Sequence, residues 1–286
     1  MIDGRARVAF LGPLGTFSHA AVDSYFADSV DKLSVSSIDE VFLAVETDRA
    51  EYGVVPVENS TEGAVTTTQE CLIDTSLRIM AEIIIPVVHN VLISPEAAAE
   101  GICRVVSHRQ SLAQCRGWLK KNWPGIEQRE VSSNAEAARL AAADKTTAAI
   151  AGLMAAETYG LSVLAAGIQD RSNNSTRFLV IARESAAATG HDKTSILVYA
   201  ENKPGALFRV LEPFATNQVS LTRIETRPAR DDMWAYVFFI DFEGHENDEP
   251  VRNVFAQLQH CTVKIKNLGS YPAASSAAAS SLSLGD

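Results

Sequence analysis

The sequence contains few cysteines, few basic residues and no long apolar segment. Only four of its 286 residues are cysteine, and none stands in a C-x-x-C pair or at the Cys/His spacing of a structural zinc site. A disulfide framework and a metal centre are therefore not expected, and free thiols suit a reducing compartment. The 25 lysines and arginines are outnumbered by 35 acidic residues, so the net charge of -10 argues against nucleic-acid binding.

No apolar stretch is long enough to span a membrane. The run at residues 8–12 is too short for the core of a signal peptide, and no small-residue cleavage site follows it. These features predict a cytoplasmic protein with no membrane partner. The hydrophobic fraction of 47% is ordinary for a soluble globular chain, and the length suits two or three compact units.

Short apolar runs alternate with helical patterns through about residue 185. Ser37 and Ser133 each open a capping box, with a glutamate three residues later and an apolar stripe or an alanine-rich segment behind it. Such alternation predicts parallel sheets covered by helices, arranged as two α/β lobes around a cleft. The β-branched stretch 78–94 is expected to cross between the lobes. The expected bounds are residues 1–80 and 168–185 for the first lobe and 81–167 for the second.

A different pattern follows the polar, small-residue segment 186–193, which is expected to be a linker. Residues 194–271 have the element order β-α-β-β-α-β, which predicts a small ferredoxin-like domain. The tail at 272–286 is rich in alanine and serine and is predicted to be disordered.

Four segments of the α/β region place polar residues where a strand meets a helix or a turn. Gly12–Ser18 offers glycines and a helix start to an anion, but as a single motif it is better explained by a tight turn with Ser18 as N-cap. Pro56–Gly63 presents amide and hydroxyl groups together with Glu58, a possible proton carrier, or forms an elaborate N-cap. Ser107–Leu112 puts His108 and an arginine at a helix start.

The fourth segment, Asn173–Phe178, leads into a strand. If it is extended, Thr176 and Phe178 share one face and Arg177 points to the other. In the C-terminal domain, Asn202–Leu207 joins a strand to a helix through Pro and Gly, and Glu225–Pro228 ends the next strand with an arginine that could hold a carboxylate.

As a set, these segments resemble the prephenate dehydratase family. Gly12–Ser18, Val55–Val65, Ser107–Gln114 and Asn174–Phe178 are similar to successive motifs of its catalytic domain, and the Thr-Arg-Phe element is the most specific. Residues 194–270 resemble an ACT regulatory domain, including its Gly-Ala-Leu loop and its Glu-Ser-Arg-Pro motif. Departures are small: Arg109 stands where proline is common, Thr226 replaces a serine, and Phe208 follows Gly-Ala-Leu.

The resemblance implies a two-lobed fold like that of periplasmic binding proteins, followed by a βαββαβ ACT domain. It implies a monofunctional enzyme of phenylalanine biosynthesis in the shikimate pathway, because the first strand begins too early to leave room for the chorismate mutase of some relatives. The implied reaction is that of a decarboxylating hydro-lyase, which converts prephenate to phenylpyruvate and needs no metal or other cofactor.

The resemblance also implies roles for individual residues. The expected catalytic residues are Thr176 at the departing hydroxyl and Glu58 as an acid. The expected substrate contacts are Gly15, Thr16, Phe17, Asn59, Ser60, Thr61, Ser107, His108, Gln110, Asn174, Ser175, Arg177 and Phe178. The expected contacts to the effector, phenylalanine, are Asn202, Pro204, Gly205, Ala206, Leu207, Glu225, Thr226, Arg227 and Pro228.

Several alternatives stay open at this level. The substrate could be arogenate, or the chain could be a non-catalytic ligand sensor with a two-lobed binding domain and an ACT module. Either Thr176 or Glu58 could supply the proton. ACT modules commonly pair across chains, so a homodimer or a homotetramer is expected.

Overall fold

The computed structural model describes residues 5–201, 203–228 and 236–274. Its contacts divide the chain into two compact units. Of the described residues, the first unit contains those up to Gln69 together with Ile83–Phe178, and the second contains Glu70–Glu82 and those from Leu179 to residue 274. Strands β5 (Arg78–Pro86) and β11 (Ser175–Ala182) run through both units.

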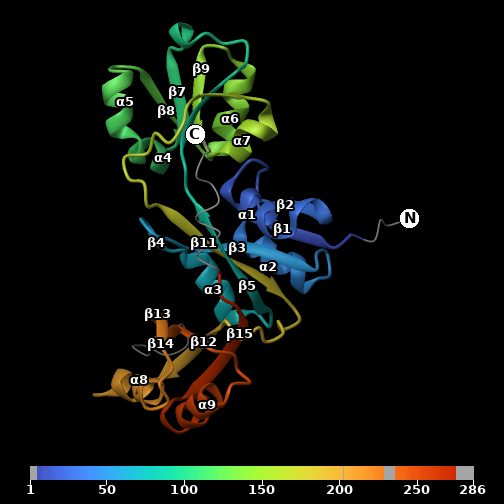
Figure 1. Cartoon of the computed structure of the whole chain (residues 1–286), viewed down its shortest axis with the longest axis vertical. Coiled ribbons are helices and arrows are strands. Elements are labelled where there is room, and N and C mark those ends of the chain that lie inside the picture. Colours follow the sequence, from blue (N-terminus) through green and yellow to red (C-terminus); the bar gives the residue numbers. More distant parts are fainter. Residues whose placement is uncertain (1–4, 202, 229–235, 275–286) are drawn as a thin grey trace. The chain divides into compact units, whose positions relative to one another are not determined.

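The first lobe is built on a sheet with the strand order β2-β1-β3-β11-β5, to whose strand β3 the short β4 is paired (Figure 1). Strand β1 is parallel to both of its neighbours, and its Val8, Ala9 and Phe10 are fully buried. Besides β5 and β11, the elements of this lobe are β1 (Arg7–Leu11), α1 (Phe17–Phe26), β2 (Asp31–Val35), α2 (Ile38–Glu46), β3 (Tyr52–Asn59), β4 (Gly63–Ala64) and α3 (Thr66–Asp74).

The second lobe has the strand order β10-β6-β9-β7-β8. Helices α4 and α5 cover one face of this sheet and α6 and α7 the other, with a separate apolar core on each side (Figure 1). Its elements are β6 (Asn90–Ile93), β7 (Arg104–His108), α4 (Arg109–Gln114), α5 (Arg116–Asn122), β8 (Glu127–Val131), α6 (Asn134–Ala143), β9 (Thr147–Ala151), α7 (Leu153–Tyr159) and β10 (Ser162–Ala165).

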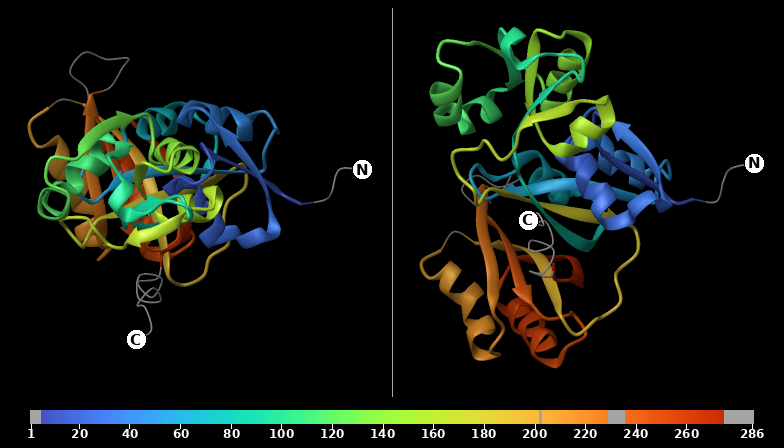
Figure 2. Two further views of the ribbon diagram at one scale, coloured as in Figure 1. Left: turned by 90° about the horizontal axis from the view of Figure 1, so that it is seen from above. Right: turned by 45° about the horizontal axis from the view of Figure 1, so that its top comes forward.

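Two connections join these lobes, one through residues 87–89 and the other through residues 166–174 (Figure 2). Backbone hydrogen bonds hold the two connections together: Val87 N donates to Asn174 O at 2.8 Å, and Ile168 N donates to His89 O at 2.8 Å. His89 N also donates to Oε1 of Gln169 at 3.0 Å. The hinge between the lobes is therefore itself an ordered, hydrogen-bonded pair of segments.

The C-terminal module is a four-stranded antiparallel sheet in the order β13-β14-β12-β15. Alternate residues of β12 and β14 form its apolar core with Val210, Phe214, Val254 and Leu258 from two helices. Its elements are β12 (Asp192–Ala200), α8 (Ala206–Thr216), β13 (Leu221–Pro228), β14 (Tyr236–Glu243), α9 (Glu249–Cys261) and β15 (Lys264–Pro272).

The predicted fold class is confirmed: two α/β lobes are followed by a βαββαβ domain. The N-caps of both predicted capping boxes are confirmed, because Ser37 accepts from Glu40 N and Ser133 accepts from Glu136 N. The domain bounds stay a prediction. The predicted disordered tail falls from residue 275 on outside the described residues.

The expectation of purely parallel sheets is wrong. In the second lobe β7 is parallel to β8 and β9, whereas β6 is antiparallel to β9 and to β10. The chain enters this lobe from the hinge through β6, so this strand runs against the others. The predicted crossing strand 78–94 is accordingly two strands, and the helix expected to start near Ser107–Leu112 ends at Gln114, with Cys115 between α4 and α5. Strand β2 and helix α7 were not predicted.

Within the described part of the chain, none of the helices has both the length and the apolar character that a membrane span requires.

Candidate active site

The centre of the first unit is a chain of amide side chains that begins at Asn59, the last residue of β3. The backbone N–H groups of Thr61 and Glu62 donate to Oδ1 of Asn59 at 2.9 and 3.1 Å. Backbone nitrogens can only donate, so this oxygen is identified and the amide Nδ2 must point the other way. Nδ2 of Asn59 lies 2.9 Å from Oγ1 of Thr176 and 2.9 Å from Oδ1 of Asn174.

The direction of these bonds decides what Thr176 can do. Its oxygen accepts the Asn59 N–H, so its own O–H proton is left to donate elsewhere. No acceptor for that proton is found among the residues that line the cleft in the described chain. Thr176 therefore offers a hydrogen-bond donor to a molecule in the cleft.

The amide chain continues into the second lobe. Asn174, which is only 5% exposed, donates from Nδ2 to Oε1 of Gln114 on α4 at 3.1 Å. The same oxygen lies 2.9 Å from Nε2 of His89 at the hinge. Burial lowers the pKa of His89, and the hydrogen bond to Gln114 opposes this only in part. The chain from Thr176 to His89 thus joins both lobes through polar contacts.

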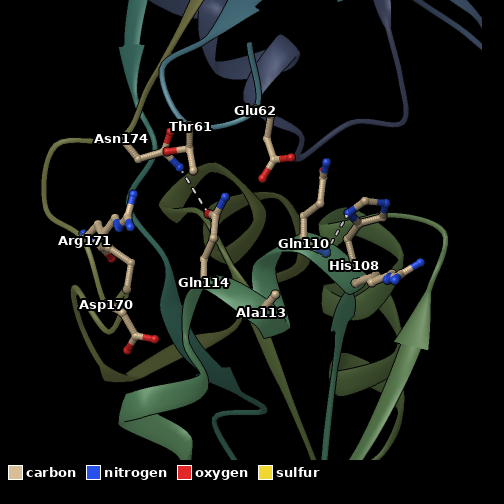
Figure 3. Close-up of a pocket in the computed structure, with 11 residues that line it drawn as sticks. Thr61, Glu62, His108, Gln110, Ala113, Gln114, Asp170, Arg171 and Asn174 are labelled. Atoms are coloured by element: carbon tan, nitrogen blue, oxygen red, sulfur yellow. Dashed lines mark hydrogen bonds between the residues drawn. The ribbon is translucent and has the colours of Figure 1, made fainter.

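Two adjoining cavities, of about 630 and 530 Å³, border this chain. Residues that line both are Glu62, His108, Gln110, Gln114 and Asn174, so the two form one cleft, whose more polar half is shown in Figure 3. The other half is lined by Phe17, Val87 and Phe178 as well as by Thr176 and Asn59. The cleft therefore combines an apolar wall with amide, hydroxyl and charged groups.

The predicted site residues divide into those that face the cleft and those that support it. The predicted residues that line it are Thr16, Phe17, Asn59, Thr61, His108, Gln110, Asn174, Thr176 and Phe178. The predicted residues that line neither cavity are Gly15, Glu58, Ser60, Ser107, Ser175 and Arg177. All four predicted segments contribute residues to the cleft, but the sequence did not separate the lining residues from the supporting ones.

The supporting group has visible structural roles. Gly15 has φ +85°, and a Cβ there would lie 3.2 Å from the backbone of Ala155, so this close approach needs glycine. Ser107 is fully buried and bonds to Asn134 Oδ1 at 3.0 Å and to Ile150 O at 2.7 Å. Ser60 accepts from Ser175 N at 3.0 Å. These contacts fix the loops that carry the lining residues.

The alternation predicted for the Thr-Arg-Phe element is present in β11. Thr176 and Phe178 line the cleft, and Arg177 does not. The guanidinium of Arg177 lies 4.0 Å from the carboxylate of Glu58, and the two side chains are 14% and 39% exposed. Glu58, which was expected to act as an acid, therefore faces the arginine.

Two helices of opposite lobes begin at the cleft. Helix α1 is capped by Thr16, whose Oγ1 accepts from His19 N, and α6 is capped by Ser133. Thr16, Phe17, Ser133 and Asn134 all line the cavity, so both positive helix ends face it. An anionic group bound in the cleft would be stabilised from both lobes.

Charged side chains gather in the polar half. His108, Arg109 and Arg171 line it together with Glu62 and Asp170. Asp170 accepts from Gly117 N at 3.0 Å and Trp118 N at 3.3 Å, so its charge is already engaged. This chain with a net charge of -10 thus has cationic groups at its cleft.

The sequence prediction missed several lining residues, above all His89, Gln114, Ser111 and Asn134. Asn134 follows a recognised N-cap, and its Oδ1 accepts from Ser111 Oγ at 2.9 Å. His89 is a lone histidine in a β-branched stretch, which gives no signal of its own. Capping position could have indicated Asn134, but nothing in the sequence pairs His89 with Gln114.

The predicted effector segments meet at one end of the module's sheet. Ala200 of β12 and Pro228 of β13 both lie opposite Tyr236 of β14, so the loop after β12 and the end of β13 share an edge. Gly205 adopts φ +78° ahead of α8, as expected for a glycine that begins the loop-to-helix turn. Asn202 lies outside the described residues.

Comparisons with known proteins agree with this architecture. Residues 8–186 match the family model described as prephenate dehydratase, and residues 194–260 match the ACT domain. A bifunctional chorismate mutase/prephenate dehydratase of Stutzerimonas stutzeri is 50% identical over 94% of this chain and 73% of its own length. A prephenate dehydratase of Mycobacterium bovis is 35% identical over 96% of this chain and 89% of its own length.

Solved structures give the same picture. Prephenate dehydratase of Arthrobacter aurescens in complex with L-Phe superposes with a TM-score of 0.85 at 34% identity, over 93% of this chain and 89% of that one. GqqA, described as a novel type of quorum quenching acylases, also gives 0.85 at 28% identity, over 94% and 98% of the two chains.

The resemblance inferred from the motifs is therefore confirmed at the level of family, fold and enzyme class. The chain belongs to the prephenate dehydratase family and has an ACT domain at residues 194–260.

Proposed function

We propose that the cleft binds prephenate and that Thr176 donates a hydrogen bond to its departing hydroxyl. The observation that carries this proposal is the direction of the Asn59–Thr176 bond, which leaves the Thr176 proton for a ligand in the cleft. The enzyme is a decarboxylating hydro-lyase, as its family is. The carbon–carboxylate bond breaks to release CO₂, its electrons enter the ring, and the hydroxyl leaves as water after taking up a proton.

The cleft supplies what this reaction needs. Aromatisation of the ring provides the driving force, so the protein must position the substrate and stabilise the leaving oxygen. A threonine hydroxyl is a very weak acid, so Thr176 acts here as a donor or a relay. Glu62 and His108 are the titratable groups that line both halves of the cleft, and they are candidates for the proton source.

We propose that the two carboxylates of prephenate bind at the N-termini of α1 and α6 and beside the arginines of the cleft. The N-termini of α1 and α6 face the cavity from opposite lobes, with Gln110, His108 and Arg109 beside them. The predicted contacts of Gly15, Ser60, Ser107 and Ser175 are proposed to be indirect, because these residues hold the lining segments. Glu58 and Arg177 are proposed to act as a supporting pair.

Phenylalanine is the proposed effector. The Arthrobacter aurescens relative is described in complex with L-Phe, and the module of this chain has its two predicted effector segments at one sheet edge. The proposed contacts are Gly205, Ala206 and Leu207 with Glu225 and Arg227. The product of the pathway would then lower activity by favouring one state of the cleft.

A homo-oligomer in the cytoplasm is proposed as the working form. Strand β13 lies at an edge of the module's sheet, and Leu207, Phe208 and Ile224 are exposed apolar residues on β13 and α8. Exposed apolar residues beside an unpaired strand edge are typical of a contact between subunits.

The likeness to the acylase is one of fold. Acyl transfer by a hydroxyl needs a base bonded to it. Among the described residues that line the cleft, no serine or threonine hydroxyl bonds to a histidine ring. The structure therefore favours the dehydratase.

The test is phenylpyruvate formation by the purified protein, with and without phenylalanine. We expect turnover of prephenate that phenylalanine suppresses. Arogenate in place of prephenate separates the two substrates, since an amine in place of the ketone calls for a carboxylate beside it. An inert protein with both substrates would contradict the enzyme, and turnover insensitive to phenylalanine would contradict the effector.

A further inference from the structure

The histidine at the hinge has a protonation state that its neighbours dictate. Asn59 Oδ1 is identified by two backbone donors, so Asn59 Nδ2 donates to Asn174 Oδ1. Asn174 Nδ2 must then face Gln114 Oε1. Because this oxygen can only accept, the His89 nitrogen 2.9 Å away must carry a proton.

The surroundings of the second ring nitrogen, Nδ1, indicate that it carries no proton and that the ring is neutral. Nδ1 of His89 is buried and has no hydrogen-bond partner among the described residues. A proton there would add a charge in a side chain that is only 2% exposed, with no acceptor to receive it. Phe17 packs edge-on against the ring, with the ring centres 6.0 Å apart.

We propose that His89 is a positioning residue for the reaction: its neutral imidazole, protonated on Nε2, holds Gln114 so that the amide chain keeps the Asn59 N–H on Thr176. The proposal rests on the proposed function of the cleft. If the Gln114 amide were flipped, its NH₂ group would face the NH₂ group of Asn174, and two donors cannot bond to each other. Asn174 could not flip in response, because its oxygen accepts from Asn59, which the backbone holds in place. His89 therefore keeps Gln114 bonded to an amide chain whose direction is set by the backbone donors to Asn59.

The position of His89 strengthens this assignment. Its backbone N–H and C=O bond to Gln169 and Ile168 of the returning connection, so the ring is carried by the hinge itself. Gln114 belongs to the second lobe, and Asn59 and Thr176 belong to the first. The ring thus connects the amide chain of the first lobe to Gln114 of the second.

One test reads the proton directly and needs no turnover. Nitrogen-15 NMR of the full chain labelled at its six histidines should contain a neutral ring protonated on Nε2 near neutral pH, and this signal should vanish in His89→Gln. A charged ring, or one protonated on Nδ1 alone, would overturn the proposal even if prephenate proved to be the wrong substrate.

A second test reads the consequence. Glutamine places an N–H where Nε2 stood, so His89→Gln should keep kcat within about threefold. His89→Leu fills the same space without a donor and should lower kcat by about 10- to 100-fold with little change in KM. His245→Asn, at a buried histidine of the module, is the control and should leave kcat unchanged. Equal losses in the glutamine and leucine variants, or no loss in the leucine variant, would contradict a positioning role.

Discussion

The cleft and the C-terminal module are held together by different kinds of contact. In the cleft, half-buried polar side chains bond across long stretches of sequence, as Asn59 does to Thr176, 117 residues away. In the module, apolar residues at alternate positions of neighbouring strands form the core. Polar chains are sensitive to direction, whereas apolar cores are sensitive to volume. Substitutions in the cleft should therefore change chemistry, and substitutions in the module should change regulation or stability.

The second unit also includes a segment of the catalytic family match. Residues 70–82 lie within the prephenate dehydratase match, yet they pack with the module. Lys266 of β15 donates to the carbonyls of Leu72 and Ile73 at 3.0 and 2.8 Å and to that of Thr75. Lys193 pairs at 2.7 Å with Glu82, whose side chain is fully buried. This segment therefore belongs to the catalytic family match by sequence and to the module by its contacts.

The largest effect should come from the Thr176 hydroxyl. Thr176→Val keeps the shape and removes the donor, so we expect kcat to fall about 10²- to 10³-fold with an unchanged melting temperature. Steady-state kinetics with prephenate measure this loss. Thr176→Ser keeps a hydroxyl and is the matched control. Near-normal turnover of the valine variant would remove Thr176 from the reaction.

Reversing the hydrogen bond to Thr176 should have the next largest effect. In Asn59→Asp an acceptor replaces the amide N–H, so the Thr176 proton should turn toward residue 59 and away from the cleft. We expect kcat to fall about 10²-fold. The double variant with Thr176→Val should lose little more than Thr176→Val alone, since both changes act on one proton. Fully additive losses would show that Asn59 works independently.

A smaller effect is expected where the segment 70–82 meets the module. Lys266→Met removes the ammonium that holds three carbonyls, so phenylalanine should need an about 5- to 10-fold higher concentration for half-inhibition. Basal kcat should stay within about twofold. Lys264→Met, at an exposed position of the same strand, is the control. Unchanged inhibition in Lys266→Met would mean that this junction does not transmit the signal.

The smallest expected effect is a difference between the two units in how their free energy of unfolding depends on pH. Burial lowers the pKa of both His89 and His19 from the ordinary 6.5, so below that pH the unfolded chain takes up protons that the folded chain does not. The free energy of unfolding of the first unit should therefore fall as the pH drops below 6.5.

The module should respond at lower pH. Burial alone would raise the pKa of Asp192, but hydrogen bonds from Thr189 and Gly190 lower it below the ordinary 3.8. The stability that Asp192 contributes is then lost only as the pH falls below 3.8. Hydrogen exchange at a series of pH values should report weakening in the first unit before the second, and His89→Gln should delay it. Simultaneous loss in both would contradict this order.

Local chemistry explains why much of the fold could be predicted. The N-caps at Ser37 and Ser133 act within four residues, and the alternation at Thr176 and Phe178 is a property of any strand. The break at Cys115 and the reversed direction of β6 could not be predicted, because they depend on how the hinge feeds the second lobe.

The sequence by itself determined the family, the two kinds of domain, and the segments that carry the site, because periodicity, caps and motifs are recorded in neighbouring residues. Only the tertiary structure decided which residues of those segments face the cleft, that Glu58 turns to Arg177, and that His89 meets Gln114. Those contacts join strands, helices and the hinge across long separations, and the direction of each hydrogen bond follows from a backbone donor that no sequence pattern records.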